Sequence, residues 1–268
     1  MSILNETYTL YNGVKIPKIG FGTWQISNAA AYDAVSAALK TGYRHIDTAR
    51  AYGNEENVGK AVRDSGLKRD EVFITSKLPA EIKGFKEAHA SFDKTIRNLG
   101  FPALDLFLIH APWPWGEKGS DYTEGNIASW KAMEELYKEG KIRAIGVSNF
   151  SESDIQAILD HCEIVPMVNQ IRLFPGHMQK DLTTFCRKHN ILLEAYSPLA
   201  TGRILDNPKI LDIAKKYKVS VAQICIRYLL QKELLPLPKT THPARIAENA
   251  AVDFVIRDED ITALDSIG

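Results

Sequence analysis

The sequence predicts an α/β fold, a closed (β/α)8 TIM barrel that is preceded by a small N-terminal β-hairpin. First, short β-branched or apolar runs alternate eight times with amphipathic stretches. Second, a length of 268 residues suits a barrel that forms one domain, residues 1–268, and no Pro-rich or Gly/Ser-rich linker interrupts it. Third, the rival fold, a doubly wound sheet, lacks its dinucleotide fingerprint. Gly20 and Gly22 are followed by Gln25 where a third glycine is needed.

The elements follow in chain order. Asn12-Gly13 between two strand-prone runs is a strong hairpin signal and predicts strands over residues 7–10 and 14–16. The barrel strands are expected at residues 19–22, 43–47, 72–77, 104–110, 142–149, 167–170, 191–195 and 234–238. Helical periodicity predicts helices at 28–41, 55–65, 85–99, 126–139, 151–160, 178–188, 208–231 and 243–252, and a short last helix at 258–267. Pro236 and Pro238 remove hydrogen-bond donors, so we expect a short last strand.

Composition and charge exclude several classes of protein. The 33 Lys+Arg residues balance 33 Asp+Glu residues, which leaves no net positive charge to attract nucleic acid or an anionic membrane. No secretory leader or uninterrupted membrane-spanning segment is visible. The three cysteines are widely spaced without a CxxC pair, so we expect neither a disulfide framework nor a metal site. These features predict a cytoplasmic protein, expected to be a monomer, whose partner is a small molecule.

Four polar residues fall at the carboxyl ends of successive predicted strands, where a barrel carries its chemistry. Asp47 ends the second strand, Tyr52 lies in the next loop, Lys77 ends the third strand and His110 ends the fourth. Each alone has an ordinary structural explanation, but together they are the parts of a proton-transfer site. An ammonium group about 4 Å from Tyr52 would stabilise its phenolate by ~4 kcal/mol at an effective dielectric near 20, before desolvation is subtracted. Asp47 would keep Lys77 charged, and His110 would orient the substrate oxygen.

Motifs that cover nearly the whole chain carry a resemblance to a known family. They are GFGTW (20–24), HIDTARAYGNEENVG (45–59), ITSKL (74–78), DLFLIH (105–110), IGVSNF (145–150), VNQI (168–171), AYSPL (195–199) and PKTTHPARIAEN (238–249). In this order they resemble the aldo-keto reductase superfamily, and the short-tailed bacterial members similar to 2,5-diketo-gluconate reductases look closest. The resemblance implies a (β/α)8 barrel that reduces aldehydes or small ketones with NADPH. It also implies that Asp47, Tyr52, Lys77 and His110 are the catalytic tetrad, with Tyr52 as general acid.

Other residues offer groups that suit a nicotinamide cofactor. Ser148 and Asn149 are not needed as helix caps, because Ser151 and Asp154 already make a capping-box-like start for the next helix. With Gln170 they offer hydroxyl and amide groups to a carboxamide, and Tyr196 offers a ring to stack on it; the resemblance implies the same roles. The further cofactor contacts that we expect are Gly22, Thr23, Trp24, Asp47, Ser197, Pro198 and Leu199.

Lys239, Thr240 and Arg245 lie around the start of the last barrel helix, where free N–H groups and the helix dipole favour an anion. A solvated charged face is the ordinary explanation for such residues. The resemblance implies instead that these three side chains bind the 2′-phosphate of NADPH, and that Glu248 and Asn249 contact its adenine.

The residues expected to contact the substrate are Trp24, Tyr52, His110 and Trp113. The segment 111–125 is long, aromatic and rich in Gly and Pro, which suits a binding loop. Many relatives carry aromatic rings where this chain has Ala111 and Pro79. The short last helix also leaves out the long C-terminal loop that closes the pocket in many relatives. With Ala111 in place of a large ring, a wide, permissive pocket is therefore expected.

Two other functions remain open. One is a cofactor-sensing binding module with negligible turnover, against which the complete tetrad argues. The other is an unrelated barrel lyase or aldolase that uses Lys77 as a Schiff base. That chemistry requires a lysine with a depressed pKa rather than one paired with Asp47.

Overall fold

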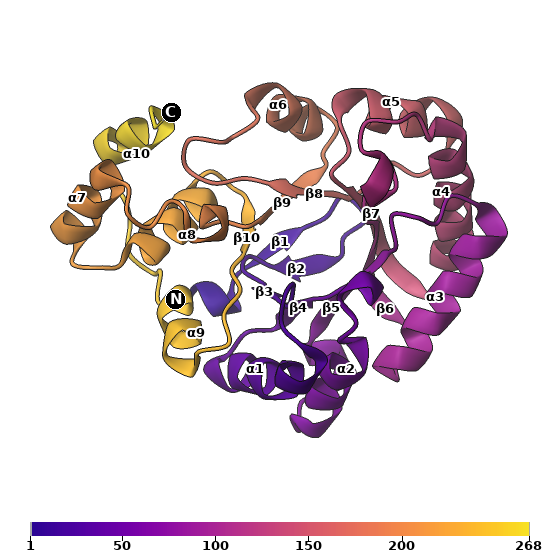
Figure 1. Ribbon diagram of the computed structural model, residues 1–268, viewed down its shortest axis with the longest axis horizontal. Coiled ribbons are helices and arrows are strands. Elements are labelled where there is room, and N and C mark those ends of the chain that lie inside the picture. Colours follow the sequence, from indigo (N-terminus) through magenta and orange to yellow (C-terminus); the bar gives the residue numbers. More distant parts are fainter. Residues whose placement is uncertain (1, 268) are drawn as a thin grey trace.

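The computed structural model describes residues 2–267, which form a ring of parallel strands surrounded by helices (Figure 1). The eight strands of this sheet follow one another in chain order, from β3 to β10, and each neighbouring pair is parallel. They span Phe21–Gly22 (β3), His45–Asp47 (β4), Phe73–Leu78 (β5), Leu104–Ile109 (β6), Ile142–Ser148 (β7), Val168–Arg172 (β8), Leu192–Tyr196 (β9) and Leu235–Leu237 (β10). The predicted (β/α)8 TIM barrel is confirmed.

The ring closes between its first and last strands. The backbone N–H groups of Gly20 and Gly22 donate to the carbonyl oxygens of Pro236 and Pro238, at 3.1 and 3.0 Å. Proline can serve here because only its carbonyl is used, and β10 has three residues, as short as the prolines predict. At Gly22 a Cβ atom would lie 3.2 Å from the carbonyl oxygen of Leu237, so the absence of a side chain permits the close approach.

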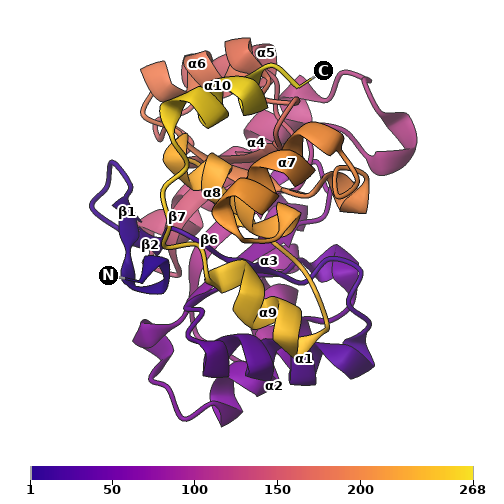
Figure 2. The same cartoon turned by 90° about the vertical axis from the view of Figure 1, so that its left-hand side faces the viewer.

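The predicted N-terminal hairpin is confirmed, and it covers the amino ends of the barrel strands. β1 spans Thr7–Thr9 and β2 spans Lys15–Pro17, and the two are antiparallel. Gly13 in the turn has φ +85°, a conformation that favours glycine. The Tyr8 hydroxyl donates to the carbonyl of Leu234 at 3.3 Å and the Tyr11 hydroxyl to that of Val165 at 2.6 Å, both just before barrel strands. The hairpin lies at one edge of the barrel in Figure 2, which leaves the carboxyl ends of the strands for a site.

The helices form the outer layer of the barrel (Figure 1). They span Asn28–Thr41 (α1), Glu55–Asp64 (α2), Phe85–Leu99 (α3), Thr123–Lys138 (α4), Glu152–His161 (α5), Lys180–Lys188 (α6), Pro208–Tyr217 (α7), Val221–Gln231 (α8), Pro243–Ala250 (α9) and Asp258–Asp265 (α10). The prediction of one helix over 208–231 is wrong. Lys218 adopts a left-handed conformation (φ 57°) that ends α7, and Ser220 with Gln223 forms a capping box that begins α8. The apolar periodicity continues across this break and conceals it.

Strand side chains alternate between the helix layer and the inside of the barrel. Phe107 of β6 packs outward on Phe92 of α3, with ring centroids 5.5 Å apart. The inside of the barrel near the carboxyl ends of the strands is polar instead, because several buried ionisable side chains meet there. Within residues 2–267, no helix is both long and apolar enough to span a bilayer.

Candidate active site

A buried ion pair between Lys77 and Asp47 lies inside the carboxyl end of the barrel. The two residues belong to neighbouring strands, β5 and β4. Lys77 Nζ lies 2.8 Å from both carboxylate oxygens of Asp47 and 2.9 Å from the carbonyl oxygen of Thr48, so all three ammonium protons have acceptors. Burial opposes the positive charge, but Asp47 and Tyr52 outweigh it and raise the pKa of Lys77. Lys77 is therefore a charged group at neutral pH.

Tyr52 lies next to this ion pair, in a single 3-10 turn (Arg50–Tyr52) after β4. Lys77 Nζ is 5.0 Å from the centre of its ring, and the His110 ring meets it edge-on with 5.5 Å between centroids. Burial raises the pKa of Tyr52 to about 12, while the charge of Lys77 acts in the opposite direction. The effect of Lys77 has the sign that the sequence predicts, but desolvation is larger. The phenol consequently stays protonated at neutral pH.

His110 follows β6 and completes the cluster. Its backbone N–H donates to the carbonyl of Leu78 at 3.1 Å, and its own carbonyl accepts from Asn149 Nδ2 at 2.9 Å. Burial and then the charge of Lys77 hold the pKa of His110 well below its usual range, so the imidazole is neutral. Within the described chain its Nδ1 atom is buried without a hydrogen-bond partner. The structure thus brings the four predicted catalytic side chains together at one place.

Gln170 of β8 links this cluster to a second buried acid. Its Nε2 atom donates to Asp47 Oδ2 at 2.8 Å and to Glu194 Oε2 at 2.7 Å. Glu194 is the register partner of Gln170 on β9 and is fully buried. The sequence analysis named Gln170 as a cofactor contact but missed Glu194. The available signal was an acidic residue inside the apolar run ILLEA.

Ser148, Asn149 and Tyr196 form a hydrogen-bonded group at the ends of β7 and β9. The Tyr196 hydroxyl donates to Asn149 Oδ1 at 2.7 Å, and Asn149 Nδ2 donates to Ser148 Oγ at 3.0 Å. Ser148 Oγ in turn donates to the backbone carbonyl of Gln170 at 2.8 Å. The capping box that we predicted for the following helix is confirmed at Ser151, so these residues do not cap it. The loop after β9 carries three further residues that the sequence predicts as cofactor contacts, Ser197, Pro198 and Leu199.

The start of α9 has the features of a phosphate site. Lys239 and Arg245 are exposed, and within residues 2–267 neither has an ion-pair partner within 4 Å. His242 occupies the N-cap position of α9 without a side-chain cap, and the buried Thr240 accepts from its N–H at 3.2 Å. Two unpaired cations at a helix start without a side-chain cap fit a doubly charged phosphate. Farther along α9, Asn249 is buried and Glu248 is half-buried.

Thr23 and Asn54 anchor the loop after β3 to the end of β4, and Asn54 is a residue that the sequence did not point to. Thr23 donates to the backbone carbonyl of Asp47 through its N–H at 3.0 Å and its hydroxyl at 2.9 Å. Asn54 Nδ2 donates to the Thr23 carbonyl at 3.1 Å, and Asn54 Oδ1 accepts from the Thr48 hydroxyl at 2.7 Å. Asn54 precedes α2 as an ordinary cap would, yet its side chain makes no cap hydrogen bond. It holds the loop on which Trp24 is exposed.

Comparison with known proteins identifies the family. Residues 18–268 match the description "Aldo/keto reductase family". The chain belongs to this family. It is 44% identical over 266 residues to the glyoxal reductase of Bacillus subtilis (strain 168), which covers 98% of this chain and 93% of that protein. The fold matches a crystal structure of an aldo/keto reductase from Brucella melitensis with a TM-score of 0.93, at 40% identity and 98% coverage of both chains. A Bombyx mori aldo-keto reductase in complex with NADP gives a TM-score of 0.89 at 32% identity, over 98% of this chain and 92% of that one.

In this aldo/keto reductase, two tryptophans of the segment 111–125 lie close to His110. The Trp115 ring meets the His110 ring edge-on at 5.3 Å, and the Trp113 ring meets Trp115 at 5.5 Å. Trp113, which the sequence predicts as a substrate contact, is half-buried beside Trp115, and Trp115 is the exposed ring that meets His110. Ala111 is fully buried, and Lys83 Nζ donates to its carbonyl at 2.7 Å. Its small side chain therefore does not leave the open space that the sequence suggests.

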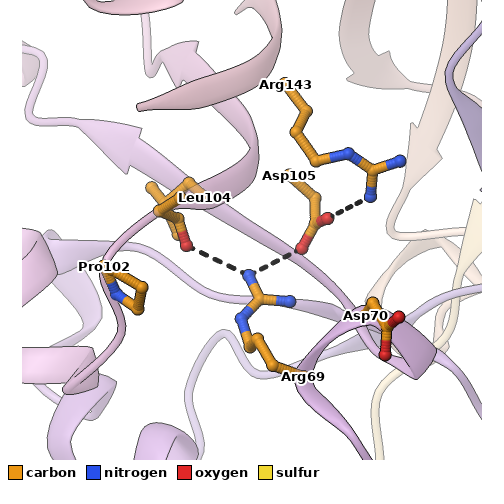
Figure 3. A pocket seen from close by; sticks show the side chains of 7 residues that line it. Arg69, Asp70, Pro102, Leu104, Asp105 and Arg143 are labelled. Atoms are coloured by element: carbon orange, nitrogen blue, oxygen red, sulfur yellow. Dashed lines mark hydrogen bonds and ion pairs between the residues drawn. The ribbon is translucent and has the colours of Figure 1, made fainter. Parts of the chain in front are cut away.

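A separate hollow of about 370 Å³ lies near the amino ends of β6 and β7 (Figure 3). The Asp105 carboxylate pairs there with Arg143 at 2.6 Å and with Arg69 at 2.7 Å, and it accepts from the N–H of Ile74 at 2.9 Å. One carboxylate is thus shared by two guanidinium groups. The hollow is lined by these ion pairs, and the candidate active site lies at the opposite end of the strands.

Proposed function

We propose that this chain is an NADPH-dependent reductase that converts aldehydes or small ketones to alcohols. The observation that carries the proposal is the buried Lys77–Asp47 pair against Tyr52, with the neutral His110 ring beside it. Family membership, the relative named glyoxal reductase and the NADP complex of the Bombyx mori protein support it. We also propose that Asp47, Tyr52, Lys77 and His110 are the catalytic residues.

The chemistry divides between the cofactor and these side chains. NADPH, when bound, supplies the hydride that reaches the carbonyl carbon. Tyr52 donates its phenolic proton to the carbonyl oxygen, because an alkoxide is a stronger base than a phenolate. Lys77 stabilises the phenolate that forms, and Asp47 holds Lys77 charged and in place. Neutral His110 donates an imidazole N–H to the carbonyl oxygen and orients it.

The cofactor would be held at two places on the barrel rim. Ser148, Asn149 and Gln170 would contact the carboxamide, with Tyr196 stacked on the nicotinamide ring. At the other place, Lys239, Thr240 and Arg245 would bind the 2′-phosphate; the absence of an ion-pair partner for the two cations within residues 2–267 supports this. The residues that would complete the cofactor contacts are Gly22, Thr23, Trp24, Asp47, Ser197, Pro198, Leu199, Glu248 and Asn249.

The Schiff-base alternative requires a neutral lysine amine. Lys77 instead donates to three acceptors, and its pKa is raised. A nucleophilic role for Lys77 is therefore disfavoured.

The test of the proposed function is the oxidation of NADPH, followed by its absorbance, with a panel of aldehydes, ketones and sugar-derived carbonyls. We expect turnover with several aldehydes. Tight NADPH binding without turnover of any carbonyl would favour a cofactor-sensing module instead. Covalent mass gained by the protein after borohydride treatment with a carbonyl would favour the Schiff-base enzyme.

A further inference from the structure

The side-chain amide of Gln170 is held by two acids at once. Its Nε2 atom lies 2.8 Å from Asp47 Oδ2 and 2.7 Å from Glu194 Oε2. A carboxamide nitrogen carries two donor hydrogens, so the two acids use both of them. Within residues 2–267 nothing donates to the remaining polar atom, Gln170 Oε1.

The chemistry of the neighbours sets which end of the amide faces them. An amide oxygen turned toward Asp47 would oppose a buried carboxylate, whereas the nitrogen can donate to it. Asp47 alone would use only one of the two hydrogens. Glu194 accepts the second, and this stops the amide from turning about its last side-chain bond. Gln170 and Glu194 can make the contact because they are register partners on adjacent strands, with both side chains inside the barrel.

Glu194 serves as an acceptor in either charge state. It is fully buried, and burial together with Asp47 raises its pKa to about 8. In the neutral acid a proton on Oε2 would point at the Gln170 donor, so the proton belongs on Oε1. Oε1 has no hydrogen-bond partner within the described chain and lies 3.9 Å from His45 Nε2. His45 Nε2 itself contacts the Thr75 hydroxyl at 2.9 Å. Oε2 thus remains an acceptor whether or not the acid is ionised.

We propose that Glu194 is a positioning residue for the cofactor: with Asp47 it occupies both N–H groups of Gln170, so that Gln170 Oε1 accepts from the carboxamide N–H of a nicotinamide. This inference rests on the proposed function, because it takes a nicotinamide cofactor as the ligand. It assigns Glu194 no contact with the cofactor and no part in the proton transfer. Its effect passes entirely through Gln170.

The free protein provides the first test. In ¹⁵N NMR spectra, the two side-chain amide protons of Gln170 can be assigned by their loss in Gln170→Leu. We expect both protons to exchange slowly with solvent in the wild type, and one of them to exchange much faster in Glu194→Leu. Glu194→Gln retains an oxygen acceptor and should keep both protected. Fast exchange of either proton in the wild type would overturn the proposal without any use of cofactor.

The second test measures the Kd for NADPH by quenching of tryptophan fluorescence. Loss of one hydrogen bond with a donor left unpaired weakens an interaction on the order of ten-fold, so we expect that loss of affinity in Glu194→Leu. Glu194→Gln should bind within about three-fold of the wild type, since its amide oxygen can still accept. In a Gln170→Leu background, Glu194→Leu should change the Kd less than two-fold, because the residue through which Glu194 acts is gone.

The double variant separates positioning from general loss of structure. Equal loss of affinity from Glu194→Leu with and without Gln170 would show a structural effect and contradict the proposal. If Glu194→Leu does not fold, the proposal is still tested by the exchange rates of the wild type and by the affinity of Glu194→Gln for NADPH. If the wild type binds no NADPH, the proposed function fails, while the exchange measurement still decides whether Glu194 holds Gln170.

Discussion

Gln170 and Asp47 are hydrogen-bonded across the inside of the barrel, with 2.8 Å between Gln170 Nε2 and Asp47 Oδ2. Their strands, β8 and β4, are separated in the sheet by β7, β6 and β5, so they face each other from opposite sides. Asp47 also accepts from Lys77 through its side chain and from Thr23 through its backbone. The proposed catalytic ion pair and the proposed cofactor contacts therefore share one residue.

Replacement of Tyr52 by Phe should abolish most carbonyl reduction. The ring remains, but the transferable proton is lost, and general acid catalysis typically contributes roughly 10²- to 10⁴-fold. We expect kcat to fall by that factor while the Kd for NADPH stays nearly unchanged. Tyr11→Phe is a matched control, since that hydroxyl lies in the hairpin at the other end of the barrel and donates to a backbone carbonyl. A kcat for Tyr52→Phe within a few-fold of the wild type would remove the role assigned to Tyr52.

Arg245→Ala should weaken NADPH far more than NADH. Arg245 and Lys239 carry the positive charges at the start of α9, and only NADPH has the 2′-phosphate that they would bind. We expect a ten-fold or greater rise in the Kd for NADPH, on the order of one lost charge-assisted hydrogen bond, and little change for NADH. Arg97→Ala removes the same charge from the exposed face of α3 and is the control. Equal losses for both cofactors in fluorescence titrations would contradict the assignment.

Trp115→Ala should change the selection among aldehydes. The Trp115 ring is exposed and meets His110 edge-on, so it stands where a bulky substrate group would pass. Removal of such a contact is worth roughly 1–3 kcal/mol, and we expect it to raise the KM for aromatic aldehydes ten-fold or more. Small dicarbonyls should lose only a few-fold. Steady-state kinetics over a size-graded series provide the measurement, and a uniform change in KM across all sizes would count against a substrate contact.

The sequence predicts the barrel and most of the site because those features follow local rules. Asp47 ends β4 and His110 directly follows β6, and a parallel barrel gathers the carboxyl ends of its strands on one rim. Even the short last strand follows from Pro236 and Pro238. Polar residues that lie at the rim can thus be predicted from their position along the chain.

Two of the features that the sequence did not predict depend on contacts between distant segments. Asn54 looks like a helix cap, but its side chain instead donates a hydrogen bond to the carbonyl of Thr23 on another loop. Glu194 looks like an isolated acid in an apolar strand, and its hydrogen bond becomes apparent only when β8 lies beside β9 in register. The break at Lys218 requires a left-handed backbone conformation, and the residue there is a lysine instead of the glycine that usually marks a helix end. For Asn54 and Glu194 the decisive partner lies outside any local pattern, whereas the break at Lys218 is made by local hydrogen bonds that the continuous apolar periodicity conceals.

Glu194 should make the protein less stable as the pH rises toward 8. Its pKa is raised from 4.5 to about 8 in the folded state by burial and by Asp47, so the folded state retains a proton that the unfolded state releases. The stability contribution of this proton is complete below about pH 4.5 and is lost as the pH rises through about 8. His45 has the opposite sign: burial and then Lys77 lower its pKa from 6.5 to about 3, so its contribution is lost as the pH falls through that range.

The two effects oppose each other at mildly acidic pH, but above pH 6.5 the contribution of His45 to the pH dependence fades as its unfolded form loses its proton, while that of Glu194 continues up to about pH 8. Relative to Glu194→Gln, the free energy of unfolding of the wild type should therefore fall between pH 6.5 and 8, by at most ~1.4 kcal/mol per pH unit for one proton. Glu194→Gln cannot release that proton, and its free energy of unfolding should stay flatter over the same range. Urea denaturation at several pH values gives the free energy of unfolding of both proteins. In the difference between the two values, the titrations that both proteins share cancel. Parallel curves for the two proteins would mean that Glu194 is already ionised in the folded barrel, because a group with equal pKa in both states adds no slope.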